Sequence, residues 1–386
     1  MSGQAVVAGG GIGGLAAALA LHRTGWQVRV LERAPGLEPV GAGLSLWPNA
    51  LRALDVLGVG GGVRRGAALS GESGIRRPDG RWLARSDVGA AVRQRYGDPL
   101  VVVHRSELID LLAAGLPDGV VSTSTTVLGV DPGDGDGPAT VRISAGGQES
   151  TLAADVVVAA DGIRSVLRQG LFPAHPAPRY AGYTAWRMVV PAGEARLAGF
   201  ETWGRDGQRF AVVPMSGDRW YCYATATTPP GRRAADECAE LSARFGSWHE
   251  PVATVVAGLT PGQVLHQDIE ELGVALPALH SGRVAVLGDA AHAMTPDLGQ
   301  GACTALEDAV VLAAELARRP VAPALEEYTR QRLPRTTAIA TRSRRAGRVY
   351  QAPYPVQGLV ARLMGLVPDV AIARGLGPVL DWRPPS

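Results

Sequence analysis

A short apolar run followed by a glycine-rich turn at the N-terminus constrains the fold more than any other feature of this chain. Residues 5–8 (Ala-Val-Val-Ala) have the composition of a buried strand, and the turn Gly9-Gly10-Gly11-Ile12-Gly13-Gly14 leads into a helical pattern. In such a turn Gly9 allows the tight bend, Gly11 lets backbone approach a pyrophosphate, and Gly14 lets helix pack close to strand. The pattern predicts the βαβ start of a dinucleotide-binding domain.

The residues after the glycine turn support the same interpretation. A helix is predicted over residues 14–23, Gly25 is well placed as its stop, and residues 28–31 form a second strand-like run. That run ends at Glu32, 18 residues after Gly14. An acidic residue in this place reaches the ribose hydroxyls of a bound dinucleotide. On this motif alone NAD and FAD are equally good candidates.

Length and composition predict a folded protein of two domains. A chain of 386 residues is too long for one ordinary domain and short for three. A hydrophobic content of 46% with 19% charged residues is typical of a packed globular protein, and a net charge of +2 gives no case for nucleic acid or an anionic membrane. All 38 basic residues are arginine, which excludes chemistry that depends on a lysine.

The cysteines and histidines give no case for a disulfide framework or a metal site. Cys222, Cys238 and Cys303 are widely spaced without a C-x-x-C pair, and the seven histidines are scattered. A strand pattern that begins at Ala5 leaves no room for a signal peptide, and no apolar run reaches the roughly 18 residues of a membrane span. We therefore expect a cytoplasmic protein that binds no metal, no nucleic acid and no membrane.

Two further glycine–aspartate pairs each follow a strand-like run. Asp161-Gly162 closes the run 155–160 and opens the sequence D-G-I-R-S-V-L-R, and Gly288-Asp289 closes the run 284–287 and opens G-D-A-A-H. A third apolar run is followed by Arg105. Taken singly, these residues can be a turn aspartate, a helix N-cap and a surface charge. Their order and spacing together point to a single cofactor site.

The three motifs in this order resemble the single-component FAD-dependent aromatic hydroxylases, that is, the p-hydroxybenzoate hydroxylase-like flavoprotein monooxygenases. The motifs are most similar to those of the salicylate and urate hydroxylase-type branch. The resemblance implies an α/β fold: a Rossmann-like FAD-binding domain, an inserted, mostly antiparallel-sheet substrate domain, and C-terminal helices. The expected segments are 1–70, 97–172 and 280–335 for the FAD-binding domain, 71–96 and 173–279 for the substrate domain, and 336–386 for the C-terminal helical segment.

The resemblance also implies which residues hold FAD. In the family, the counterpart of Asp161 lies beside the pyrophosphate, that of Asp289 binds the ribityl chain, and the segment 41–46 lies near the isoalloxazine ring. The helix after Gly299-Gln300-Gly301 points its N-terminus at the flavin, where a helix dipole stabilises negative charge by about 1–2 kcal/mol. The expected cofactor-binding residues are Gly9, Gly11, Gly13, Gly14, Glu32, Arg33, Gly43, Arg105, Asp161, Gly288, Asp289, Gly299 and Gly301.

The activity that the resemblance implies is hydroxylation of an aromatic or heteroaromatic small molecule. In the family NADH or NADPH reduces FAD, molecular oxygen forms the C4a-hydroperoxide, and an electron-rich ring attacks it, while the protein orients the ring and manages protons. An epoxidase or Baeyer–Villiger oxygenase on the same scaffold is the main alternative. A flavin-dependent reductase or dehydrogenase and a non-catalytic flavin-binding regulator are more distant ones. Monomer and homodimer both stay open.

Three residues are candidates for the substrate side. Pro296 and Asp297 follow the G-D-A-A-H motif, and most relatives have asparagine or an aromatic residue where Asp297 stands. The aspartate occurs in the urate-type branch, which also keeps a substrate-orienting arginine at the position of Arg209. We expect Asp297 to act as general base, with Arg209 holding the substrate anion and Pro296 beside them. A helix cap and a strand-edge surface charge are the structural alternatives for Asp297 and Arg209.

Periodicity predicts the remaining elements. A polar, turn-rich stretch over 69–103 is assigned mostly to strands of the substrate domain, and Ser106 is the predicted N-cap of the next helix. Further strands are expected at 120–130, 139–144, 151–160 and within 181–226, and further helices at 234–245, 301–318 and 324–349. Period two lets only some of the aromatic residues in these strands face a ligand. The six concerned are Tyr180, Tyr183, Trp186, Trp203, Tyr221 and Tyr223.

Overall fold

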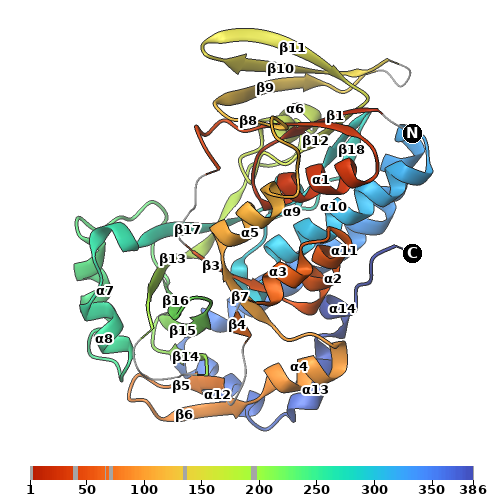
Figure 1. Ribbon diagram of the computed structural model, residues 1–386. Coiled ribbons are helices and arrows are strands. Elements are labelled where there is room, and N and C mark those ends of the chain that lie inside the picture. Colours follow the sequence, from red (N-terminus) through yellow and green to blue (C-terminus); the bar gives the residue numbers. More distant parts are fainter. Residues whose placement is uncertain are drawn as a thin grey trace.

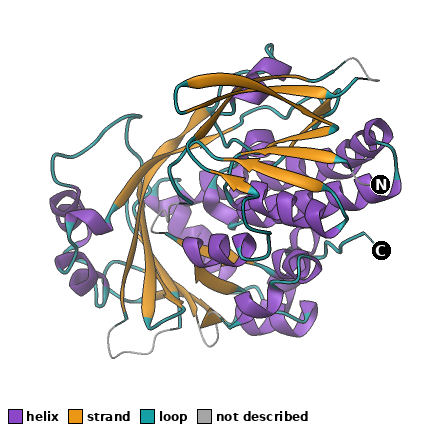
Figure 2. Cartoon of the chain, turned by 45° about the horizontal axis from the view of Figure 1, so that its top comes forward, coloured by secondary structure: helices purple, strands orange, loops and turns teal. Residues whose placement is uncertain are grey.

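The structure is a computed structural model of the chain, and it describes residues 3–37, 42–65, 67–68, 73–133, 137–192 and 198–385. Two large sheets organise the molecule (Figure 1). One is mostly parallel and belongs to the nucleotide-binding part, and the other is mostly antiparallel. Figure 2 shows the strands of the antiparallel sheet standing beside the helices of the nucleotide-binding part. The predicted fold class is confirmed.

The mostly parallel sheet has six strands in the order β18-β19-β12-β1-β2-β8. Its strands are β1 (Gln4–Ala8), β2 (Gln27–Leu31), β8 (Val121–Ser122), β12 (Val156–Ala159), β18 (His280–Ser281) and β19 (Val284–Val286). β1 pairs in parallel with β2 and β12, and β12 pairs in parallel with β19. The carboxyl ends of β1, β12 and β19 therefore share one edge, and each of the three motifs follows one of these ends.

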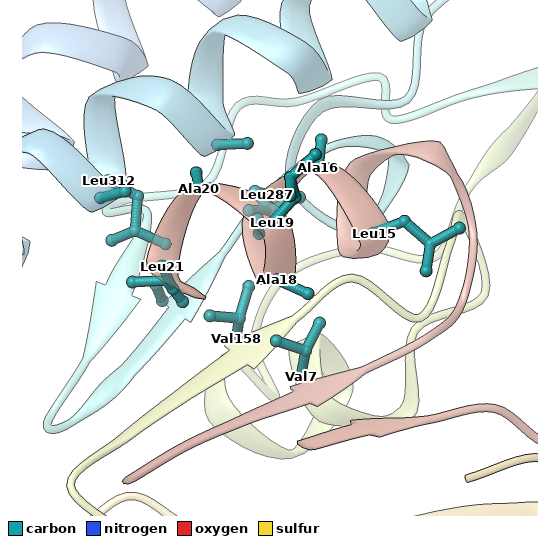
Figure 3. Close-up of a cluster of buried hydrophobic side chains, with 14 of the residues drawn as sticks. Val7, Leu15, Ala16, Ala18, Leu19, Ala20, Leu21, Val158, Leu287 and Leu312 are labelled. Carbon is teal, nitrogen blue, oxygen red and sulfur yellow. The ribbon is translucent and has the colours of Figure 1, made fainter. Parts of the chain in front are cut away.

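The helix α1 (Ile12–Arg23) lies between this sheet and the helix α10 (Gly301–Arg318), as Figure 3 shows. Leu15, Leu19 and Leu21 are at most 1% exposed, and the alanines between them are buried as well. A helix that is apolar on all sides belongs in a protein interior. α1 begins at Ile12, two residues before the predicted start, because Gly11 already serves as its N-cap.

The antiparallel sheet has seven strands in the order β17-β13-β16-β15-β14-β5-β6. These are β5 (Ser73–Arg76), β6 (Trp82–Ser86), β13 (Arg179–Pro191), β14 (Phe200–Trp203), β15 (Arg209–Met215), β16 (Arg219–Ala226) and β17 (Leu265–Glu271). β14 pairs in parallel with β5, and the other pairings in the sheet are antiparallel. The antiparallel sheet therefore combines two segments of the chain, residues 73–86 and residues 179–271, which precede and follow β12 in the sequence.

The two faces of the antiparallel sheet have different partners. The outer face is covered by α7 (Glu237–Phe245) and α8 (Val252–Ala257), and Trp186, Phe210 and Cys222 pack there (Figure 1). The inner face is turned toward the nucleotide-binding part. Because successive side chains alternate between faces, Tyr183, Tyr221 and Tyr223 lie on the inner face and Trp186 does not.

Two smaller sheets complete the strands. β9 (Thr125–Asp131), β10 (Ala139–Ala145) and β11 (Gln148–Ala154) form one of them, and β3 (Gly43–Leu46), β4 (Ala67–Ala68) and β7 (Val101–His104) form the other. β3 lies against the inner face of the antiparallel sheet. A Cβ atom on Gly43 would stand 2.2 Å from Cγ of Tyr221, so only glycine permits this approach.

The helices surround both sheets and link them. Besides those already given they are α2 (Pro48–Val56), α3 (Gly60–Arg64), α4 (Val88–Tyr96), α5 (Arg105–Ala113), α6 (Val166–Leu171), α9 (Asp289–His292), α11 (Val321–Tyr350), α12 (Tyr354–Met364), α13 (Asp369–Gly375) and α14 (Gly377–Leu380), with the 3-10 turns η1 (Pro261–Gln263) and η2 (Pro296–Leu298). α11 packs on α10 at one end and on η2 and α12 at the other. The domain boundary expected after residue 335 falls inside α11.

No single described helix is both long and apolar enough to cross a membrane. The helix pair Pro355–Met364 and Asp369–Gly375 reaches that length and composition only together, and its two members are bent by 107° relative to each other.

Three local predictions were wrong. The expected strand 151–160 is divided at Asp155 between β11 and β12, which belong to different sheets. The N-cap of α5 is His104, whose ring accepts a hydrogen bond from the backbone N–H of Ser106, so Ser106 lies inside the helix. The stretch 69–103 contains the helix α4 between its strands, and residues 69–72 lie outside the described residues.

Candidate flavin site and substrate face

The glycine turn after β1 is shaped by close packing on one side and open space on the other. Gly9 has a φ of +109°, and a Cβ atom there would stand 2.4 Å from the carbonyl oxygen of Ala160. A Cβ atom on Gly14 would stand 1.9 Å from the carbonyl oxygen of Gly9, whereas one on Gly11 would meet nothing within 4 Å. The open space lies at the N-terminus of α1, where backbone N–H groups bind phosphate. This arrangement fits a pyrophosphate.

Glu32 is fixed by the same turn. Its carboxylate accepts hydrogen bonds from the backbone N–H of Gly10 (2.6 Å) and of Ala34 (2.9 Å). The neighbouring Arg33 is exposed. The carboxylate at the end of β2 thus stands over the glycine turn and retains acceptor capacity for ribose hydroxyls.

Replacement of Glu32 tests the identity of the flavin. We expect the purified protein to release FAD and not FMN on denaturation, because a pyrophosphate turn beside a ribose-binding carboxylate serves only a dinucleotide. Glu32→Ala should weaken FAD retention and, through the two lost backbone contacts, lower the free energy of unfolding by roughly 1 kcal/mol. Chromatography of the released flavin is the measurement, and Glu32→Gln, which keeps one acceptor oxygen, is the matched control. FMN as the sole flavin would contradict the assignment.

Asp161 has an acceptor oxygen that the protein leaves unused. Its Oδ2 accepts a hydrogen bond from the backbone N–H of Leu167 (3.2 Å), but its Oδ1 is buried without a partner among the described residues. Arg168 is 1% exposed and donates to the carbonyl oxygens of Ile163 (2.7 Å) and Ala290 (3.0 Å). Arg168 thereby ties this motif to the helix that carries Asp289. The unpartnered oxygen of Asp161 fits a hydroxyl donor of a bound cofactor.

Arg105 and Asp289 face one space at the edge of the sheet. Surrounding protein atoms lower the pKa of Arg105, although the residue is exposed. The negative charge of Asp289 opposes this lowering, and the positive charge of Arg187 adds to it. Gly288, with φ +60°, is the N-cap of α9, and Asp289 is its exposed first residue. Two exposed side chains of opposite charge suit the ribityl hydroxyls and phosphates of FAD.

Asp289→Ala should release FAD or prevent its reduction. A hydrogen bond to a charged group is worth about 1.5–3 kcal/mol, which corresponds to an increase of about ten- to 150-fold in the FAD dissociation constant. Titration of the apoprotein with FAD, followed by flavin fluorescence, measures the change. Asp110→Ala, an exposed aspartate on α5, is the matched control. Equal FAD affinity in both variants would reduce Asp289 to a helix cap.

The N-terminus of α10 lies beside these groups. Gly299 has φ +60°, and a Cβ atom on it would stand 3.2 Å from the indole Nε1 of Trp47. A Cβ atom on Gly301 would stand 4.0 Å from Oδ1 of Asp289. A Cβ atom on Gly13 would stand 2.9 Å from Cδ1 of Leu287, so the expected flavin glycines line a contiguous region.

Five residues form a buried polar group on the inner face of the antiparallel sheet, which we call the Arg209 cluster: Tyr183, Glu201, Arg209, Tyr223 and Asp297. The Arg209 side chain is 5% exposed. Its Nη2 donates to Oε1 of Glu201 (2.6 Å), its Nη1 donates to Oδ1 of Asp297 (3.2 Å), and the ring of Tyr350 lies 4.4 Å from its guanidinium carbon. Burial alone would lower the pKa of Arg209, but the negative charges of Glu201 and Asp297 have the larger effect and raise that pKa.

The carboxylate of Asp297 is enclosed within the cluster. Its side chain is 2% exposed, and its Oδ2 accepts a hydrogen bond from the hydroxyl of Tyr183 (2.7 Å). A Cβ atom on Gly347 of α11 would stand 2.4 Å from the same oxygen. Burial and the charge of Asp297 raise the pKa of Tyr183, so this hydroxyl is a donor. Pro296, one residue earlier in η2, is exposed.

A second buried charge network lies along the helix α10. Glu307 and Asp308 are 0% exposed, and Arg332 of α11 pairs with both at 2.7 Å. His292 donates to Asp308 (2.5 Å), and Arg335 pairs with Glu307 (2.6 Å). Burial would raise the pKa of Asp308, but the charges of His292 and Arg332 hold it at about 2. This network connects α10 to α9 and α11.

The structure places the expected cofactor residues Glu32, Asp161 and Asp289 at one edge of the parallel sheet. It leaves Arg33 exposed.

Other residues of the region were not predicted from the sequence. Arg332 and Arg335 belong to a helix in which nothing local distinguishes them from exposed arginines. Glu201 was missed because its role depends on strand pairing, and for the same reason Tyr183 was named only as one of six aromatic residues that could face a ligand. Arg187 could have been found, since period two places it on the same face as Tyr183.

Comparisons with known proteins agree with the geometry. The sequence profile of the FAD binding domain family matches residues 3–343. The aurachin C monooxygenase/isomerase of Stigmatella aurantiaca is 38% identical over 352 residues, covering 90% of this chain and 89% of that protein. The FAD-dependent urate hydroxylase of Klebsiella pneumoniae subsp. pneumoniae is 34% identical over 355 residues, covering 89% of each.

A solved structure extends the likeness to three dimensions. The crystal structure of Klebsiella pneumoniae HpxO complexed with FAD and uric acid superposes with a TM-score of 0.89 at 30% identity, covering 98% of this chain and 96% of that one. The match to the sequence profile, over residues 3–343, includes the glycine turn, both aspartate motifs and the antiparallel sheet. The chain belongs to the FAD-binding family of flavin-dependent aromatic hydroxylases and is a flavoprotein monooxygenase.

Proposed function

We propose that the protein uses NADH or NADPH to hydroxylate an aromatic or heteroaromatic small molecule. One observation carries the proposal: Glu32, Asp161 and Asp289 meet at one edge of the parallel sheet, opposite an inner sheet face rich in tyrosine and arginine. The three carboxylates suit a dinucleotide, and the inner face of the antiparallel sheet suits a small ring with polar substituents.

In this proposal the protein binds and orients both reactants. FAD bound at this site would supply the redox chemistry: reduced by NADH or NADPH, it would activate molecular oxygen for transfer to the substrate. The glycine turn and Glu32 hold its adenosine end, while Asp161, Asp289 and Arg105 hold the chain toward the flavin ring. Tyr221 and β3 enclose the ring side and exclude water, which strengthens each electrostatic contact there.

Asp297 remains the candidate for proton management, with Arg209 and Pro296 beside it. Both carboxylate oxygens of Asp297 are occupied, by Tyr183 and by Arg209. Asp297 therefore acts on the substrate through one of these two partners, or exchanges one of them for the substrate. Pro296 is exposed at the start of η2 and serves as a wall beside the ring.

A ligand screen tests the proposal. The FAD-loaded protein is mixed with phenols, aromatic amides, aromatic acids and purines, and NADH and NADPH oxidation is followed together with oxygen uptake. We expect at least one ligand to accelerate oxidation and to yield a product that carries one oxygen atom from labelled molecular oxygen. Ligand-stimulated oxidation without oxygen incorporation would support a reductase or dehydrogenase instead. An epoxide or ring-opened product would select the epoxidase or Baeyer–Villiger alternative.

A further inference from the structure

Glu201 binds two of the three nitrogen atoms of the Arg209 guanidinium. Its Oε1 accepts hydrogen bonds from Nε (2.9 Å) and Nη2 (2.6 Å) of Arg209 and from the hydroxyl of Tyr223 (2.8 Å). Its Oε2 accepts a hydrogen bond from the indole of Trp203 (2.6 Å). Four donors fix one carboxylate whose side chain is 18% exposed. This geometry leaves Glu201 little freedom to release Arg209.

The charge of Arg209 is more than balanced within the cluster. One guanidinium faces two carboxylates, Glu201 and Asp297, and the region is nearly dry. A substrate carboxylate at Arg209 would be the third negative group around a single positive one. In a medium of low dielectric constant such a group is repelled rather than bound.

Arg187 stands on the same face of the sheet with no acidic partner. Strand register places Arg187, Tyr223, Ala211 and Glu201 in one row across β13, β16, β15 and β14. Arg187 donates to the neutral side chain of Gln267, and none of the carboxylates in the described part of the chain pairs with it. It is the cation of this row, and its bond to the amide oxygen of Gln267 shows that it can hold a neutral carbonyl acceptor.

Arg187 also lies toward the flavin side of the face. Strand register makes Tyr221, against which β3 packs through Gly43, a diagonal neighbour of Arg187 on the same face of the sheet. Burial raises the pKa of Tyr221, and the charge of Arg187 opposes that rise. The same charge contributes to the lowered pKa of Arg105, an expected cofactor contact. Arg187 and Arg105 are thus near enough for their charges to interact.

We propose that Glu201 determines substrate specificity: it neutralises Arg209, so that Arg187 is the cation that contacts the substrate. The inference rests on the proposed function and narrows its substrate class. The preferred substrate is an aromatic or heteroaromatic ring without a carboxylate. Its phenolic or carbonyl oxygen faces Arg187, and a neutral N–H or O–H donor faces Glu201.

Isosteric ligand pairs test the inference without turnover. Hydroxybenzamides and the corresponding hydroxybenzoates differ in charge but hardly in shape, and their dissociation constants can be measured from the perturbed flavin spectrum of the FAD-loaded protein. We expect the wild type to bind the amide at least tenfold more tightly than the acid. In Glu201→Gln, Arg209 keeps Asp297 as its only acidic partner, so the cluster loses its excess negative charge, and the preference should shift at least tenfold toward the acid. Arg187→Gln should weaken both members of a pair by about tenfold.

The controls separate specificity from folding. Glu240→Gln removes a carboxylate that pairs with Arg244 on the outer helix α7, and it should leave the amide-to-acid ratio unchanged. If Glu201→Gln does not bind FAD, the inference is still tested by the amide-to-acid affinity ratio of the wild type and by the affinities of Arg187→Gln. Equal or tighter binding of the acid by the wild type, binding of no amide at all, or unchanged affinities in Arg187→Gln would each overturn the inference. Amide binding without ligand-stimulated NADH or NADPH oxidation would instead reject the proposed function.

Discussion

Asp297→Asn is expected to retain FAD and bind substrate, yet to form product about 10²–10⁴-fold more slowly, the usual worth of general-base assistance. Asparagine keeps the shape of the side chain and can still accept the hydrogen bond from Tyr183. It offers no charge to Arg209, however, and it cannot take up a proton. Reducing equivalents that no longer reach the substrate should appear as hydrogen peroxide.

The measurement is product formed per NADH or NADPH consumed, for wild type and Asp297→Asn, across a pH series. A role in proton transfer changes the pH profile, whereas a purely structural role changes only stability. Asp206→Asn, in an exposed turn of the same sheet, is the matched control. If rate and coupling in Asp297→Asn equal those of the control, Asp297 is a structural residue and the base lies elsewhere.

Arg332→Met is expected to lower the free energy of unfolding by about 3–5 kcal/mol, the cost of removing one partner from a buried ion pair. Glu307 and Asp308 have no exposed surface, so the charges left behind cannot be solvated. Urea unfolding of the FAD-loaded protein measures the loss. Arg330→Met is the control on the same helix, because Arg330 is 73% exposed and pairs with Glu327 at the surface. A loss equal to that of the control would show that the buried network contributes no net stability.

The same variant should be more sensitive to acid. In the folded wild type the pKa of Asp308 is held at about 2, below its ordinary value of 3.8. A depressed pKa stabilises the fold at pH values above the ordinary pKa, and this contribution is lost as the pH falls from about 4 to about 2. Without Arg332 the pKa of Asp308 rises, and the loss should begin at higher pH. Unfolding curves at a series of pH values between 3 and 7 follow this shift.

The cofactor half of the site was predictable because its chemistry is local. Glycine turns, strand ends and the aspartates that follow them occupy fixed places in short motifs, and parallel strands bring their carboxyl ends to one edge. The substrate half of the site was not predictable, because Glu201 meets Arg209 and Tyr223 only through the pairing of β14, β15 and β16. No spacing along the chain encodes that register.

Other differences have equally specific causes. The apolar pattern continues through Asp155, yet the chain changes sheets there because the Asp155 carboxylate accepts a hydrogen bond from the backbone N–H of Gln4 (2.8 Å). His104 replaces Ser106 as N-cap because an imidazole nitrogen can accept the same backbone hydrogen bond. The burial of Arg332 could not be read from its own helix, because its partners Asp308 and Glu307 lie 24 and 25 residues earlier, on α10.

The single helix α11 makes the chain intolerant of length changes at one place. Arg332, near the middle of α11, pairs with two carboxylates of α10. Near the end of α11, Gly347 packs against Asp297 and the ring of Tyr350 lies against Arg209. An inserted residue in an α-helix turns everything beyond it by about 100° and advances it by about 1.5 Å. One extra residue between 336 and 346 would therefore swing Gly347 and Tyr350 away from the Arg209 cluster while leaving the flavin end intact. Related sequences should vary in length at the exposed turn Gly146-Gly147 and keep one fixed length between Arg332 and Tyr350.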